Sequence, residues 1–284
     1  MLQMKEKNRV INIILIGLCF LTFGSPNALA WETSGEVGAG LLYTEVYTGS
    51  DEFYLTPLPI FKIALEGERN SIYLSIIDGV GVRHIFGTNG YFTDISLNFG
   101  SERDSQHYTV MGFERSHSDR TKSFLKNTPT VSTDVIGKMA FGYSAQWGTI
   151  ICSAEYHPTK VDYSDSLTED ENLEGFLYTL AYSRGYALTP EIMVNGVVGV
   201  EFMNGAYADA WFSNKNSTEK LKQFDAKGGL KGVLAVFDAV GQLSDDVVVK
   251  VTLVAKYLTG DAADSPYTRQ KFQPTAIIGA VYNF

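Results

Sequence analysis

The chain has 284 residues, a net charge of −9 and 32 acidic against 23 basic residues. This balance argues against nucleic acid or an anionic lipid surface as the main partner, because both are bound by clustered Lys and Arg. A disulfide scaffold is excluded as well, because the chain has two cysteines, Cys19 and Cys152, and the first lies in a segment that we expect to be removed.

The N-terminus has the pattern of an export signal. Its first ten residues include three basic side chains, Lys5, Lys7 and Arg9. An uncharged apolar run over 10–23 follows, and then Ala28-Leu29-Ala30, the small-x-small pattern after which signal peptidases cut. The run is short for a membrane-spanning helix. We therefore expect residues 1–30 to be a cleaved signal peptide; an N-terminal anchor helix is the alternative, disfavoured because no second apolar stretch extends the run.

Beyond residue 30, segment after segment alternates between large apolar and small or polar residues, with a period of two. Phe176, Tyr178, Leu180 and Tyr182, for example, alternate with smaller residues. This period is that of a β-strand. We expect about twelve strands, with boundaries good to about two to four residues. Their ranges are 36–46, 54–65, 70–77, 80–86, 91–99, 131–145, 149–159, 175–187, 190–203, 228–240, 247–258 and 274–284.

The connections between these strands alternate in length. Short links fall at 66–69, 87–90, 146–148, 188–189 and 242–246, and the long links 100–130, 160–174, 204–227 and 259–273 fall on the other side. No linker or low-complexity stretch divides residues 31–284. Short periplasmic turns and long extracellular loops are typical of outer-membrane proteins. The pattern predicts one all-β domain, a closed antiparallel transmembrane β-barrel in the outer membrane of a Gram-negative bacterium.

The last strand indicates which face meets lipid. Alternation alone does not, because a soluble barrel of the lipocalin kind alternates too. Counting back from the terminal Phe284, Tyr282, Ala280 and Ile278 share one apolar face. A terminal aromatic of this kind is typical of the signal by which the outer-membrane assembly machinery recognises its substrates. We therefore predict that Tyr282 and Phe284 form that signal and that the apolar face contacts outer-membrane lipid.

The opposite phase of the strands carries charged residues and predicts a polar lumen of mixed sign. The residues placed there are Lys62, Asp94, Asp134, Lys138, Glu155, His157, Glu191, Glu201, Lys250 and Lys256. Such charges can line a water-filled path, or they can fill the lumen with their own salt bridges. The sequence leaves both alternatives open.

The sequence shows few patterns that are typical of catalytic or metal-binding sites. The chain has no Gly-x-Ser-x-Gly, His-Glu-x-x-His or P-loop motif. His107, His117 and Asp119 share one long loop, but their spacing matches no tight metal site. The acidic stretch within 162–174 lacks the order of a calcium loop. We expect no enzymatic activity, no cofactor and no metal.

Three motifs carry a family resemblance. The first is Tyr47-x-Gly49-Ser50-Asp51 followed by Pro57-Leu58-Pro59, and the second is Leu258-x-Gly260-Asp261-Ala262-Ala263-Asp264-Ser265-Pro266. The last strand then ends on Tyr282-x-Phe284. Together with the stretch 224–230, these motifs resemble the MipA/OmpV family (MltA-interacting proteins) across the whole mature chain. The middle departs from the family pattern, with Leu125-Lys126-Asn127-Thr128-Pro129 and Trp211-Phe212-Ser213 in place of Gly-rich and Tyr-Phe-Gly stretches.

The resemblance implies an outer-membrane protein. The member that gives the family its name is similar to a scaffold that joins a lytic transglycosylase to a peptidoglycan synthase. Other members resemble osmotically regulated barrels or adhesins. We expect a non-enzymatic interaction barrel linked to murein remodelling; the alternative is a small diffusion channel with a polar, mixed-charge lumen. The motif residues suit structural tasks: Gly49 and Gly260 permit tight turns, and Pro57, Pro59 and Pro266 fix φ at strand starts.

Overall fold

The computed structural model describes residues 31–110, 113–163, 170–215, 217 and 220–284. The predicted signal peptide, residues 1–30, lies outside the described residues.

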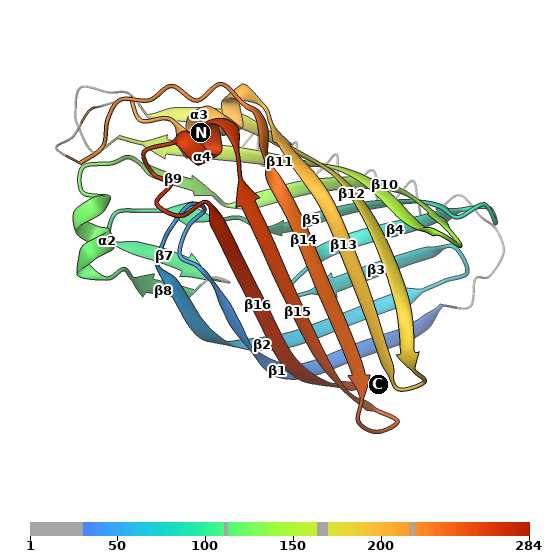
Figure 1. The fold of residues 1–284 in the computed structure, drawn as a ribbon. Coiled ribbons are helices and arrows are strands. Elements are labelled where there is room, and N and C mark those ends of the chain that lie inside the picture. Colours follow the sequence, from blue (N-terminus) through green and yellow to red (C-terminus); the bar gives the residue numbers. More distant parts are fainter. Residues whose placement is uncertain (1–30, 111–112, 164–169, 216, 218–219) are drawn as a thin grey trace, which may run out of the picture.

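Twelve strands form the wall of a closed barrel, which confirms the predicted fold (Figure 1). They are β1 (Glu32–Glu45), β2 (Phe53–Glu66), β3 (Asn70–Ser75), β4 (Gly79–Phe86), β5 (Tyr91–Phe99), β10 (Val135–Ala145), β11 (Gly148–Asp162), β12 (Glu171–Thr189), β13 (Ile192–Met203), β14 (Gly229–Gln242), β15 (Val247–Leu258) and β16 (Phe272–Asn283). Each strand pairs antiparallel with its neighbours, β5 with β10 across the longest loop and β1 with β16 at the seam. Because β1 pairs with β16, every strand of the wall has a neighbour on both sides.

The alternation seen in the sequence separates the two faces of this wall. On β16, Tyr282 and Ile278 are exposed on the outside, whereas Val281 is buried inside. On β15, Leu253 is exposed outside and Thr252 points inward, where it donates to the Asp238 carboxylate at 2.7 Å. An apolar band therefore surrounds a lumen lined by polar groups, the distribution expected of a barrel in lipid.

The loops are sorted between the two ends of the barrel. Five links of two to four residues and the C-terminus lie at what we call the short-turn end, whereas the three-residue link between β3 and β4 lies at the opposite end. The long loops gather at the other, the long-loop end, together with small elements of their own (Figure 1). These elements are β6 (Glu102–Arg103), β7 (His107–Val110), β8 (Phe113–Ser116), α2 (Asp119–Phe124), β9 (Thr130–Thr133), α3 (Gly205–Phe212) and α4 (Gly260–Asp264). None of the described helices is long and apolar enough to cross a membrane.

One predicted strand, 131–145, is two elements. The chain breaks at Asp134 between β9 and β10. Strand β10 stays in the barrel wall, while β9 pairs with the overhanging end of β11 and with β6 above the wall. Asp134 preserves the alternation of its neighbours, so the sequence carries no signal for this break.

One edge of strand β2, the edge that faces β3, is unpaired from Phe53 to Ile60 among the described residues. The strand pairs with β1 over its whole length but with β3 only from Lys62 to Glu66. The Phe61 carbonyl accepts from Ile76 on the β3 side, and Pro57 and Pro59 share the alternation of Phe61. Their missing N–H groups therefore fall on the unpaired edge, where no ladder bond is lost. The two prolines lie inside β2, not at its start as predicted.

Two buried apolar clusters join the loops at the long-loop end into what we call the cap. The first packs α3 and α4 on the ends of the strands: Val131, Val161, Leu177, Met203, Tyr207, Ala208, Ala210, Trp211, Phe212, Ala226, Leu258, Ala262 and Ala263. The second joins four loops to the inner faces of β1, β2, β15 and β16: Leu42, Val46, Tyr47, Leu58, Ile60, Tyr108, Leu125, Leu221, Val248, Tyr267 and Val281. Burial of this apolar area stabilises the cap.

Candidate functional site: the lumen and its cap

Ion pairs line the inner face of the barrel. Lys250 Nζ lies 2.5 Å from the Glu36 carboxylate, across from β15 to β1. Arg83 Nε lies 3.0 Å from the Asp94 carboxylate, which also accepts from the Tyr73 hydroxyl at 2.9 Å. These pairs neutralise carboxylates on the inner face, of which Asp94 is buried and Glu36 is partly exposed.

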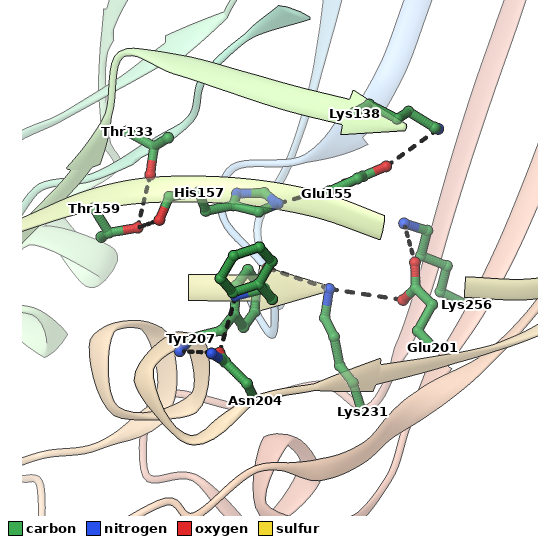
Figure 2. Close-up of polar contacts among 11 residues, drawn as sticks. Thr133, Lys138, Glu155, His157, Thr159, Glu201, Asn204, Tyr207, Lys231 and Lys256 are labelled. Atoms are coloured by element: carbon green, nitrogen blue, oxygen red, sulfur yellow. Dashed lines mark hydrogen bonds and ion pairs between the residues drawn. The ribbon is translucent and has the colours of Figure 1, made fainter. Parts of the chain in front are cut away.

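The largest group of charges, which we call the lysine cluster, lies beside Tyr207 of α3 (Figure 2). It consists of Lys138, Glu155, His157, Glu201, Lys231 and Lys256. Lys138 Nζ lies 3.2 Å from Glu155, and the His157 ring lies 3.5 Å from the same carboxylate. Glu201 accepts two cations, Lys231 at 3.6 Å and Lys256 at 3.4 Å.

A β-bulge places Lys231 in this cluster. Glu201 pairs with Gly232 but the next residue, Phe202, pairs with Leu230, so Lys231 has no residue opposite it. A bulge re-aims side chains in this way. Lys231 consequently points inward, buried, with its Nζ 3.4 Å from the Tyr207 hydroxyl of α3. Lys231 was not among the predicted lumen residues, because the strand 228–240 shows no clear alternation that would reveal a bulge.

The predicted lumen residues fall in three groups. Asp94, Lys138, Glu155, Lys250 and Lys256 face inward, each in an ion pair. Lys62 also faces inward, with its Nζ 6.0 Å from the centre of the Tyr73 ring. Asp134 does not line the lumen, because it lies exposed in the bend between β9 and β10. Glu191 is likewise exposed, in the turn that precedes β13. Both residues lie outside the wall strands, beyond the segments in which alternate side chains face the lumen.

The motif residues from the two ends of the chain meet in the cap. Asp51 forms an ion pair with Arg269 at 2.8 Å. The Gly49 carbonyl accepts from the Arg269 amide at 2.7 Å, and the Gly49 amide donates to the Gln273 side chain at 3.0 Å. Gly49 has φ +95°, and a Cβ there would lie 3.0 Å from the Thr268 Cα. Glycine is therefore required where the first loop crosses the last one.

The second motif is anchored in the same layer. The Ser265 hydroxyl donates to the Phe212 carbonyl of α3 at 2.7 Å. The Asp261 carboxylate accepts from the Lys227 amide at 2.7 Å, which fixes the segment 224–230 beside α4. Gly260 takes φ +51° at the start of α4, and Asp264 is paired at the surface with Lys271 at 3.4 Å. The motif residues Gly49, Asp51, Asp261, Asp264 and Ser265 thus have structural contacts in the cap.

Arg103 is buried at the centre of the cap. Its guanidinium donates to the Trp211 carbonyl at 2.5 Å and lies 3.9 Å from the centre of the Tyr267 ring. The Tyr267 hydroxyl in turn donates to Asn214 at 3.1 Å. Burial raises the pKa of Tyr47, which adjoins this group, to about 12, so its hydroxyl stays protonated. One cation therefore joins the loop before β9 to α3 and to the loop before β16.

The histidines of the longest loop serve the fold of that loop. The His117 ring is buried, with Nε2 3.1 Å from the Asp104 carbonyl, and packs against Tyr47 and Tyr108. His107 begins β7 and pairs in register with Ser116. No group of three or more His, Cys, Asp or Glu within the described ranges is arranged to hold a metal.

The predicted assembly residues lie at the seam of the barrel. Tyr282 is exposed on the outer face of β16. Phe284 follows the strand, exchanges two backbone hydrogen bonds with Gly35, at 2.9 and 3.0 Å, and places its ring over that glycine. The last residue therefore completes the pairing of β16 with β1.

Comparison with known families decides the relationship. The family described as MltA-interacting protein MipA matches residues 37–284. The chain belongs to this family. This confirms the resemblance carried by the motifs, and the MipA-family barrel is an outer-membrane protein.

Solved structures of similar fold are distant in sequence. The translocator domain of autotransporter NalP from Neisseria meningitidis is 12% identical, with a TM-score of 0.44, and the match covers 99% of this chain and 95% of that one. The anion-selective porin from Comamonas acidovorans is 9% identical, with a TM-score of 0.37 and coverage of 90% and 99%. No curated protein matches this chain.

Proposed function

We propose that this chain is a non-enzymatic outer-membrane interaction protein whose short-turn end contacts a cell-wall enzyme in the periplasm. The observation that carries the proposal is the cap. Four loops interlock through the second apolar cluster, and Arg103 joins two of them to α3. A mouth covered by buried side chains favours a function performed on the surface of the barrel over free diffusion through it.

The class of partner comes from the family. Its description names a protein that interacts with MltA, and the resemblance implies that such a partner is a lytic transglycosylase, with a peptidoglycan synthase as a second partner. Both act on murein, which lies on the periplasmic side of the outer membrane. Short turns face the periplasm in barrels of this kind, so the short-turn end is the surface that such enzymes can reach.

An acidic edge marks one part of that end. Glu66 ends β2, Glu68 lies in the turn that follows it, and Asp245 and Asp246 lie in the turn before β15; all four are exposed. These turns flank β1 and β16, so the four carboxylates lie on the same side of the rim. The rim is shallow, and a stable interface usually buries about 1,200–2,000 Å². We therefore expect weak, salt-sensitive binding to basic residues of the partner.

Affinity capture of a lytic transglycosylase tests this proposal. Reversal of all four acids to Lys should abolish capture and leave the barrel heat-modifiable. The matched control reverses Asp225 and Asp264, which are exposed at the long-loop end, and should capture as the unmodified protein does. Absence of capture by the unmodified protein, or equal loss in the control, contradicts the proposal.

A small diffusion channel is the second candidate, and one observation favours it. The Lys138 and Lys256 side chains face inward, yet they are 44% and 39% exposed. Solvent therefore reaches the lumen below the cap. Steady single-channel conductance that responds to Lys250→Gln or Glu155→Gln would support this candidate.

A further inference from the structure

Three ion pairs of the lumen are asymmetric in exposure. In Arg83–Asp94, Lys138–Glu155 and Lys256–Glu201, the cation is 53%, 44% and 39% exposed, whereas its carboxylate partner is 10%, 22% and 7% exposed. The carboxylates lie against the wall and the cationic ends point into solvent. In these three pairs, the inner face of the barrel therefore presents the cation to solvent and not the carboxylate.

This asymmetry is strongest in the lysine cluster. Three ammonium groups, from Lys138, Lys231 and Lys256, face two carboxylates. Glu155 acts electrostatically on both Glu201 and Lys231, so the two halves of the cluster form one electrostatic unit. Of the three cations, Lys231 is buried, where charges interact more strongly than in water.

The fold holds this excess in place. The bulge in β14 turns Lys231 inward, where it is 5% exposed and lies 5.3 Å from the centre of the Tyr207 ring. The His157 ring packs edge-on against the same tyrosine, with 5.0 Å between ring centres. The His157 ring is buried, and its Nε2 lies 3.5 Å from the Glu155 carboxylate. Figure 2 shows these side chains converging from β10, β11, β13, β14, β15 and α3.

We propose that the lysine cluster is a binding site for a small oxyanion, a solute that carries a carboxylate or phosphate group. The solvent-exposed ends of Lys138 and Lys256 bind the anion, and the buried Lys231 supplies the positive potential behind them. Carboxylates and phosphates accept charge-assisted hydrogen bonds from ammonium groups, which are stronger than neutral ones.

The solute enters from the short-turn end, because the cap covers the other mouth. The acidic rim repels an anion and slows its entry without changing the contacts that it makes in the cluster. Binding should therefore weaken as salt screens the lysines, while entry becomes faster. This site is independent of any partner at the rim.

Titration calorimetry of the purified barrel in detergent tests the proposal, with inorganic phosphate and succinate as probes and choline chloride at equal ionic strength as the control. We expect saturable binding of the anions and none of choline. Lys138→Gln combined with Lys256→Gln should weaken binding at least about tenfold, the loss expected for one or two charge-assisted hydrogen bonds. Binding of both probes indicates any oxyanion, and binding of only one identifies phosphate or carboxylate as the recognised group.

The matched control is Lys250→Gln, which removes another exposed lumen lysine that is paired with a carboxylate. It should change the affinity less than about twofold, well below the loss of one charge-assisted hydrogen bond. If the double variant does not fold, protection of Lys138 and Lys256 from an amine-reactive reagent by phosphate or succinate in the unmodified protein replaces it. Absence of saturable anion binding, equal loss in Lys250→Gln, or no protection overturns the proposal.

Discussion

Asp51 and Arg269 form an ion pair of 2.8 Å that joins the loop after the first strand to the loop before the last one. Arg269 is largely buried, and its guanidinium also packs on the Phe124 ring at 4.8 Å. Asp51 accepts a second cation, Arg120 of the longest loop, at 2.9 Å. The Asp51 carboxylate thus connects three loops of the cap. Two of these loops adjoin β1 and β16, the strands that close the barrel.

Arg269→Gln should loosen the cap without unfolding the barrel. The substitution removes a charge-assisted contact worth about 1–3 kcal/mol. Amide hydrogen exchange over 46–52 and 259–271 should accelerate accordingly, while exchange in β14 stays unchanged. Lys271→Gln, which breaks a surface pair with Asp264, is the control and should cost at most about 1 kcal/mol. Unchanged exchange in Arg269→Gln would show that the apolar clusters alone hold the cap.

Two groups make the cap sensitive to acid. Burial raises the pKa of Glu52, but hydrogen bonds from the Ser118 hydroxyl and amide outweigh it and hold the pKa below its usual 4.5. Burial lowers the pKa of His117 below its usual 6.5, an effect larger than the opposing pull of the Asp104 carbonyl. Each group binds its proton less readily in the folded cap than in the unfolded chain. The contribution of these groups to cap stability is therefore complete above pH 6.5, and it declines as the pH falls through each lowered pKa.

Hydrogen exchange of α2, corrected for its intrinsic pH dependence, measures this effect. Protection should decrease in two steps, the first below pH 6.5 and the second below pH 4.5. Glu52→Gln should remove the second step and weaken α2 at neutral pH, because Ser118 caps that helix and donates to Glu52 at 2.6 Å. Constant protection from pH 7.5 to pH 4 is the outcome that would refute this account of the two groups.

Leu253 and Thr252 provide a direct test of which face meets lipid. Leu253→Arg places a charge on the outer face, at a cost of about 2–4 kcal/mol near the bilayer midplane. Thr252→Arg places the same charge inside, next to the Asp238 carboxylate. Folding into lipid vesicles, measured by heat-modifiability, should fall sharply in the first variant and little in the second. Equal damage would indicate that both faces are packed.

Phe284 combines two contributions that substitutions can separate. Deletion of the residue removes both of its backbone hydrogen bonds to Gly35 as well as the aromatic ring. Phe284→Ala keeps the backbone bonds and removes the ring alone. If the ring is an assembly signal, both changes should lower the amount of heat-modifiable barrel in cells, whereas only the deletion should destabilise protein refolded from denaturant. Normal assembly of Phe284→Ala in cells would assign the effect to the backbone pairing.

The wall of the barrel could be predicted from the sequence because alternation and lipid exposure are local properties. Leu253 and Thr252 fall on the faces that the period of two assigns to them. The break at Asp134 could not be foreseen, because the residues on both sides keep the same phase. Nor could the inward turn of Lys231, because a bulge shifts the phase of one strand against its neighbour and leaves no mark in the sequence of either.

The cap was beyond prediction for a different reason. Its contacts join loops that are far apart in the chain, as in Arg103 with Trp211 and Tyr267 or Gly49 with Gln273. Loop residues have no periodicity, so neither their burial nor their partners follow from pattern. The motif residues were found by resemblance, and only the structure shows that Asp51 and Arg269 meet.

Single-channel conductance of the refolded barrel in planar bilayers distinguishes a capped barrel that works through its surface from an open pore. We expect no steady conductance from the unmodified protein and intermittent openings when Arg269→Gln is combined with Arg103→Ala, because these changes release the cap. Steady conductance of the unmodified protein that changes with Lys250→Gln or Glu155→Gln would contradict this expectation.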